Sequence, residues 1–367
     1  MTDSEGDHDD VVLVPVCEPL ARKETSCPHF RLARIKTSCD GSPRTVCGLP
    51  ATATPTQLCG SGRSASASCL PPPSSALARD YGFASWPALQ LEVARRRVLD
   101  LHDDDALAAF IADHPDLATA ELTRWRDHPK GASPLGYLAM ARYDTATHTW
   151  RDVVGTGAAA HVLIAAGAPV DGNPGDPETP LITAASYGDA DVAAALIAAG
   201  ADLDAIASDT SGGVPGGSAL LHAAVFGMTD VLDLLVAAGA GVRSIEEAAA
   251  SGDVTGWLTA DTPHQARLRA LIMAVDHQRL DVIDTLIDAD TPVDAQDDLF
   301  GRHPLRLAAG NGRPASVRAL LAHGADPARR DLHGLTPLDH CRRGRAGATD
   351  QTAHDEVEAI LDRSLSS

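Results

Sequence analysis

The chain has 367 residues and a formal net charge of −20 at pH 7, from 30 Lys and Arg against 50 Asp and Glu. Residues 75–367 hold 23 of the basic and 42 of the acidic side chains. Because Lys and Arg supply most of the affinity for phosphate backbones, this charge argues against nucleic-acid binding and favours a basic protein partner. No apolar run approaches the roughly 20 residues that span a bilayer, so we expect no membrane segment.

Residues 1–74 show neither a helical nor a strand period and pass into a serine- and proline-rich cluster. Such a segment cannot offset its ordering entropy, so we expect a disordered leader, or a start assigned upstream of the true one. An acidic beginning, MTDSEGDHDD, argues against a signal peptide and for a cytoplasmic protein. The spacing of the cysteines matches no zinc site, and we expect neither metal nor cofactor. The leader holds Cys17, Cys27, Cys39, Cys47, Cys59 and Cys69, and the seventh cysteine is Cys341.

Residues 75–98 differ sharply from the leader because apolar and aromatic side chains recur at helical spacing around Gly82. Ser85 is placed to cap the second of two short helices, and Pro87 suits its first turn. We expect an N-terminal capping pair with Trp86 in its core.

Clear signals for the start and end of helices occur in the stretch from Thr179 to Asp204, TPLITAASYGDADVAAALIAAGADLD. Thr179 begins a short helix as its cap, and Gly188 can end that helix in the left-handed conformation. Asp189 can then cap a second helix, which Gly200 stops. The stretch therefore predicts an antiparallel helical hairpin.

Copies of this hairpin follow at Ser218–Val242 and His303–Arg329. Equivalent leucines, Leu163 and Leu196, lie 33 residues apart. The next interval, from Leu196 to Leu235, is 39 residues because of a glycine-rich insertion at 208–217. A unit of this size cannot bury its own apolar stripe, so the repetition predicts a stack of units.

These repeats, with T-P-L at 179–181 and 336–338, resemble ankyrin repeats, whose units have about 33 residues. Residues 77–89, LARDYGFASWPAL, are similar to the leader helices that precede the repeats of many bacterial ankyrin-repeat proteins. The resemblance implies an all-α solenoid of about seven to eight repeats over residues 99–367, including divergent ends.

Several units depart from the family pattern. An insertion at 142–156, which contains Tyr143, His148 and Trp150, interrupts one unit. After Val242 the pattern weakens, and we expect a short helical pair at 245–251 and 254–258. The histidine that follows T-P-L in the family is absent, and His222 lies one position later. The residues at the family position are Ile182, Leu221, Arg306 and Asp339.

The resemblance implies a non-catalytic module that binds a partner protein through a concave groove and through fingers, the loops that project between units. We place the fingers at 168–178, 201–217 and 291–303. Whether Phe300 is exposed or folds under its finger is left open. The candidate partner-binding residues are Leu299, Phe300, Asp297, Asp298, Trp150 and Asp209.

Enzyme motifs are missing from the sequence. The acidic run 102–105 suits the start of a helix better than a metal site, because acids favour the positive end of a helix dipole. His277, His323, His333 and His340 fall at turns, where surface polar residues are common. Two alternatives remain: an enzyme or effector with activity in the leader or at 243–266, and a regulatory or inhibitory subunit of an enzyme.

Overall fold

The computed structural model describes residues 73–122, 132–144, 149–298, 301–331, 333–348 and 350–366. It divides into two compact units between Val93 and Ala94. The first contains helix α1 (Pro73–Asp80) and the beginning of α2 (Trp86–Leu101). There, Ala78 and Leu89 are buried and Trp86 is half-buried.

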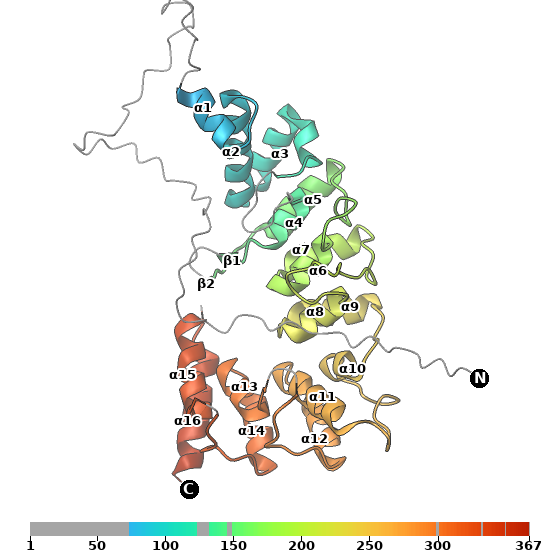
Figure 1. Ribbon diagram of the computed structural model, residues 1–367, viewed down its shortest axis with the longest axis vertical. Coiled ribbons are helices and arrows are strands. Elements are labelled where there is room, and N and C mark those ends of the chain that lie inside the picture. Colours follow the sequence, from blue (N-terminus) through green and yellow to red (C-terminus); the bar gives the residue numbers. More distant parts are fainter. Residues whose placement is uncertain are drawn as a thin grey trace, which may run out of the picture. The chain divides into compact units, whose positions relative to one another are not determined.

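The second unit is a series of helical hairpins in which each first helix packs on the next (Figure 1). The first helices are α4 (Pro134–Ala139), α6 (Pro180–Tyr187), α8 (Ala219–Val225), α10 (Ile245–Ser251), α11 (His264–Asp276), α13 (Pro304–Gly310) and α15 (Pro337–Gly347). The second helices are α5 (Thr156–Ala165), α7 (Ala190–Ala198), α9 (Thr229–Ala238), α12 (Leu280–Asp288), α14 (Pro314–Ala322) and α16 (Thr352–Leu365). Helix α3 (Asp104–Asp113) and the 3-10 turn Pro115–Ala118 precede them.

The predicted capping residues begin and end these helices. In the α6–α7 hairpin, the Thr179 hydroxyl accepts from the Ile182 N–H at 3.2 Å. Gly188 ends α6 with φ of +66°, and Asp189 accepts from the Val192 N–H at 3.0 Å. The sequence prediction of this hairpin is confirmed.

Small side chains form the contacts between successive first helices. Because alanine adds little beyond its Cβ, neighbouring helices approach closely and still exclude water. At one crossing even a methyl group would not fit, since a Cβ on Gly344 would lie 1.8 Å from the Gly310 carbonyl oxygen. The fully buried alanine pairs are Ala184–Ala185, Ala223–Ala224, Ala248–Ala249 and Ala308–Ala309.

The expectation of a helix at 254–258 is wrong, because residues 253–262 form turns. Asp253 accepts from the Thr255 N–H at 2.7 Å, and Gly256 has φ of +86°, both of which favour a turn. Helix α10 therefore has no second helix. Its C-terminal carbonyls are instead reached by a later side chain: Arg279 Nε donates to the Ala250 oxygen at 2.7 Å.

The insertion at 142–156 forms a short antiparallel hairpin of β1 (Tyr143–Asp144) and β2 (Thr149–Trp150). Tyr143 pairs with Trp150 in its register. His148 lies outside the described residues.

Candidate functional site

The fingers are tied to neighbouring loops by aspartates. In each case a carboxylate in a finger accepts a backbone N–H of the loop between the following helices, and in one case that loop is itself the next finger. These bonds join Asp171 to the Asp202 N–H at 2.9 Å, Asp204 to the Gly241 N–H at 3.0 Å, and Asp294 to the Asp326 N–H at 3.2 Å.

The long finger insertion at 208–217 is anchored by His222. This side chain is fully buried; its Nδ1 lies 2.8 Å from the Ser186 hydroxyl and its Nε2 lies 3.0 Å from the Val214 carbonyl oxygen. Gly213 allows the loop to approach, since a Cβ there would lie 2.8 Å from the imidazole ring. Burial lowers the pKa of His222 and keeps it neutral. With the ring buried and both nitrogens engaged, His222 anchors this loop to α6.

Acidic groups dominate the fingers before residue 243. The sequence contains no Lys or Arg between Arg151 and Arg243, while eleven Asp and Glu lie in that stretch. Asp171, Asp202 and Asp209 are exposed there. Asp209, a predicted contact residue, therefore lies on an acidic surface.

The finger at 291–303 differs in part from its prediction. Asp297 is a predicted contact residue, but its side chain is buried and accepts from Arg302 Nε at 2.8 Å. It supports the finger from within because a buried carboxylate requires a charged partner. Asp298 is accessible and bonds Arg269 Nη1 at 3.0 Å. Leu299 and Phe300 lie outside the described residues.

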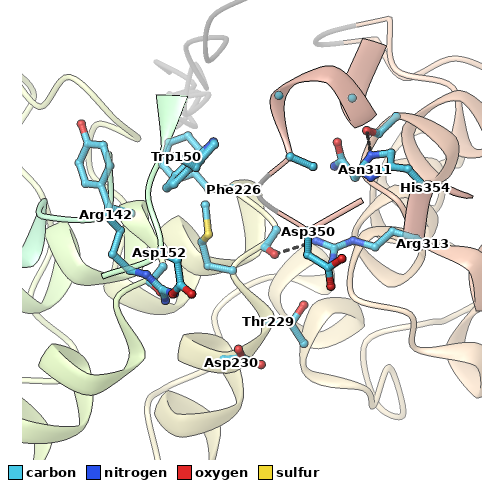
Figure 2. A pocket seen from close by; sticks show the side chains of 18 of the residues that line it. Arg142, Trp150, Asp152, Phe226, Thr229, Asp230, Asn311, Arg313, Asp350 and His354 are labelled. Carbon is cyan, nitrogen blue, oxygen red and sulfur yellow. Dashed lines mark hydrogen bonds and ion pairs between the residues drawn. The ribbon is translucent and has the colours of Figure 1, made fainter. Parts of the chain in front are cut away.

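A hollow of about 740 Å³ lies at the other end of the hairpins, where the first helices finish. The C-terminal ends of α6, α8, α13 and α15 and the β1–β2 hairpin surround it. Figure 2 shows Trp150 and Phe226 facing it from one side and Arg313, Asp350 and His354 from the other. We call it the helix-end hollow.

Aromatic groups form one wall of the helix-end hollow. Trp150, another predicted contact residue, has 40 % of its surface exposed. Its ring centroid lies 5.0 Å from that of Tyr143 and 6.4 Å from that of Tyr187. Phe226 and Met228 continue the wall. Trp150 therefore makes tilted ring contacts with both tyrosines and still presents a large apolar face.

The opposite wall is polar and rigid. Arg313 donates from Nε to the buried Asp276 at 3.1 Å and from Nη2 to the Gly227 carbonyl at 2.9 Å. Gly227 has φ of +70°, and a Cβ there would lie 2.7 Å from Asp276. His354 Nε2 lies 3.0 Å from the Gly310 carbonyl oxygen.

Sequence reasoning missed these arginines. Arg142, Arg279 and Arg313 each lie three residues beyond the end of a first helix. Each donates to a carbonyl oxygen at the end of a different first helix: Gly188, Ala250 and Gly227 respectively. Arginine at the same position in three units was the signal that could have revealed them.

Reactive groups in the described part of the chain are engaged structurally. Within the described ranges, no group of three His, Cys, Asp or Glu side chains could hold a metal ion. Cys341 is buried, and burial raises the pKa of its thiol to about 11, which leaves it protonated and unreactive. Among the described helices, none is long and apolar enough to cross a membrane.

A family model of ankyrin repeats, three copies long, matches residues 154–246 and 247–347, more than half of the chain. The chain belongs to the ankyrin-repeat family. Its fold is the predicted ankyrin solenoid, and ankyrin repeats generally mediate protein–protein interaction. The ankyrin-repeat domain of human ASB11 is a similar solved structure, with 20 % identity and a TM-score of 0.35 over 74 % of this chain and 96 % of that one. No curated protein sequence matches the chain.

Proposed function

We propose that this ankyrin-repeat protein is a non-catalytic interaction protein whose fingers bind a basic segment of a partner protein. The observation that carries the proposal is the stretch from 152 to 242, which has no Lys or Arg and whose fingers expose several carboxylates. An acidic surface attracts a basic partner, speeds its encounter and disfavours acidic competitors.

The aspartate bonds of the fingers also favour binding. Loops that are already ordered lose less conformational freedom when a partner docks, so more of the contact energy becomes affinity. Leu299, Phe300 and Asp298, in the finger at 291–303, remain predicted partner-binding residues.

The proposal can be tested by removing negative charge from the fingers while keeping the shape of the side chains. Asp171→Asn, Asp202→Asn and Asp209→Asn together delete three finger charges while retaining an oxygen that can accept the same backbone N–H groups. The matched control, Asp191→Asn, Asp281→Asn and Asp288→Asn, deletes three exposed charges on the second helices. Each full-length protein is used to capture partners from lysate of the organism that makes it, with carbodiimide coupling of carboxylates to partner lysines.

We expect the wild type and the control to retain the same stoichiometric partner and the finger triple variant to lose it. Coupled peptides should join finger aspartates to Lys-rich segments. Retention of the partner by the finger variant, or coupling confined to the second helices, would contradict the proposal.

A further inference from the structure

The lining of the helix-end hollow holds four arginines and three aspartates, whereas the fingers at 168–178 and 201–217 hold acidic residues and no Lys or Arg. Two of its three acids are engaged within the protein. Asp152 lies 3.7 Å from Arg142 Nη2, and Asp350 accepts both the N–H and the hydroxyl of Thr352, at 2.9 and 2.7 Å. Asp230 is exposed at the beginning of α9, where the helix dipole favours an acid.

Two arginines at the hollow, Arg151 and Arg343, have no acidic partner among the residues that the structure describes. Arg343 is exposed and forms no ion pair with any described residue. Arg151 donates from Nη2 to a carbonyl oxygen, that of Ala141, at 3.0 Å, and forms no ion pair within the described ranges. Residues 75–367 hold 42 acidic and 23 basic side chains, yet neither of these two arginines pairs with a carboxylate of the described residues. They leave the hollow with an unsatisfied preference for negative charge.

The same hollow exposes Trp150 beside these cations. Fixed, partly exposed tryptophans and arginines are the residue types that dominate the binding energy of protein interfaces. The two arginines and Trp150 come from the β1–β2 hairpin and α15, which the stacking of the intervening repeats brings to one hollow.

We propose that the helix-end hollow is a second docking site, independent of the fingers, and that it takes a short acidic peptide segment carrying a large apolar side chain. The apolar side chain packs on Trp150, and a neighbouring carboxylate pairs with Arg343. The hollow extends over several repeats and opens to solvent, which suits an extended peptide better than a small ligand that a pocket must enclose.

A nucleic acid would also use aromatic and arginine side chains. Here the surrounding charge opposes it. Phosphates approaching the hollow meet Asp230 and the −20 net charge of the chain, whereas a peptide with one or two carboxylates incurs less repulsion.

The test is selection of a random peptide display library on the immobilised full-length chain, followed by affinity measurements with the enriched peptides. We expect enriched peptides to hold Trp, Phe or Leu within three residues of Asp or Glu. Trp150→Ala and Arg343→Glu should each weaken binding at least tenfold. Matched controls are Trp257→Ala, at a tryptophan of similar exposure, 38 %, and Arg329→Glu, at another exposed arginine. Both controls should leave the affinity unchanged.

Three outcomes would overturn the proposal: no enrichment, enrichment of basic peptides alone, or equal binding to Trp150→Ala and Arg343→Glu. Displacement of the peptide by oligouridylate at equimolar concentration would overturn it in favour of a nucleic acid. Circular dichroism establishes that each variant is folded; Arg343→Glu alters an exposed side chain and so tests the charge even if Trp150→Ala loosens the hairpin. Loss of finger binding in the earlier test has no bearing on this result, because the variants lie at opposite ends of the hairpins.

Discussion

His277 shows how one buried side chain joins distant units of the stack. Its Nδ1 lies 2.9 Å from the Thr229 hydroxyl and its Nε2 lies 2.9 Å from the Ala224 carbonyl oxygen. The natural arrangement is a neutral ring that accepts from the hydroxyl and donates to the carbonyl. Burial is the main reason that the pKa of His277 is lowered, with Asp276 opposing it and Arg313 and Arg279 adding to it.

We predict that acid destabilises the protein through His277. Below about pH 6.5, His277 is protonated in the unfolded chain but stays neutral in the folded chain. The stability that the neutral ring contributes is therefore fully present above that pH and is lost as the pH falls. We measure the free energy of unfolding with urea between pH 7.5 and 5.5. As the pH falls, it should decline less steeply in His277→Gln than in the wild type, and the two slopes should differ by up to about 1.4 kcal/mol per pH unit. The limit of pH 5.5 stays above the pI of 5.0.

His323→Gln is the control, since His323 bonds Asp284 at the surface. An identical slope for wild type and His277→Gln would contradict the prediction. The sequence placed both histidines at turns and could not separate them. Burial of His277 depends on α8 and α9, about 50 residues earlier, and only the tertiary structure brings them to it.

At the scale of elements, α16 closes the stack by two different means. Its buried face includes Val357 and Leu361, both fully excluded from water. Its acidic face pairs with arginines of α14 and α15. These pairs are Arg318–Glu356, Arg342–Glu358 at 2.9 Å and Arg345–Asp355 at 2.5 Å.

We predict that the apolar face matters more than the ion pairs. Leu361→Ala should lower the free energy of unfolding by about 2–4 kcal/mol, the usual effect of a cavity in a packed core. Replacing Asp355, Glu356 and Glu358 with Asn, Gln and Gln should lower it by less than Leu361→Ala does, because exposed pairs are screened by solvent. Urea unfolding of both variants shows which change costs more stability. A larger loss in the charge variant than in Leu361→Ala would contradict the prediction.

Local sequence signals predicted most helices, failed at 254–258 and did not predict the β1–β2 hairpin. Caps such as Thr179 and Asp189 act within three residues, so their effect is readable in the sequence. The segment 254–258 has apolar residues at plausible spacing, but its turn bonds from Asp253 and Thr262 compete with a helix. The aspartate bonds of the fingers and the arginines of the helix-end hollow join residues from different units, and a single repeat does not reveal them.

At the scale of the whole molecule, the hairpin of α10 lacks its second helix, so the row of second helices is interrupted between α9 and α12. The stack is expected to separate most easily at this point. A repeat protein is held together by contacts between neighbours, so one weakened interface divides it. The bridge from Gly227 through Arg313 to Asp276 spans this point.

We predict that Gly227→Ala uncouples the two parts of the stack. The added methyl group would displace Asp276 from Arg313, whereas Gly239→Ala has a similar positive φ, +90°, and no neighbour within 4 Å. Both variants should incur about 1–2 kcal/mol of backbone strain. By hydrogen exchange, amides of 303–366 should exchange faster than those of 156–238 in Gly227→Ala only. Uniform acceleration in both variants would show that the bridge does not couple them.

The absence of basic residues between Arg151 and Arg243 also changes how the protein can be broken down. A protease that cuts after Lys or Arg finds no bond to hydrolyse there, so complete digestion of the unfolded chain with trypsin leaves residues 152–243 as one 92-residue peptide. The acidic fingers are thus invisible to trypsin-like degradation, and unfolding within them can be followed only with a protease of different specificity.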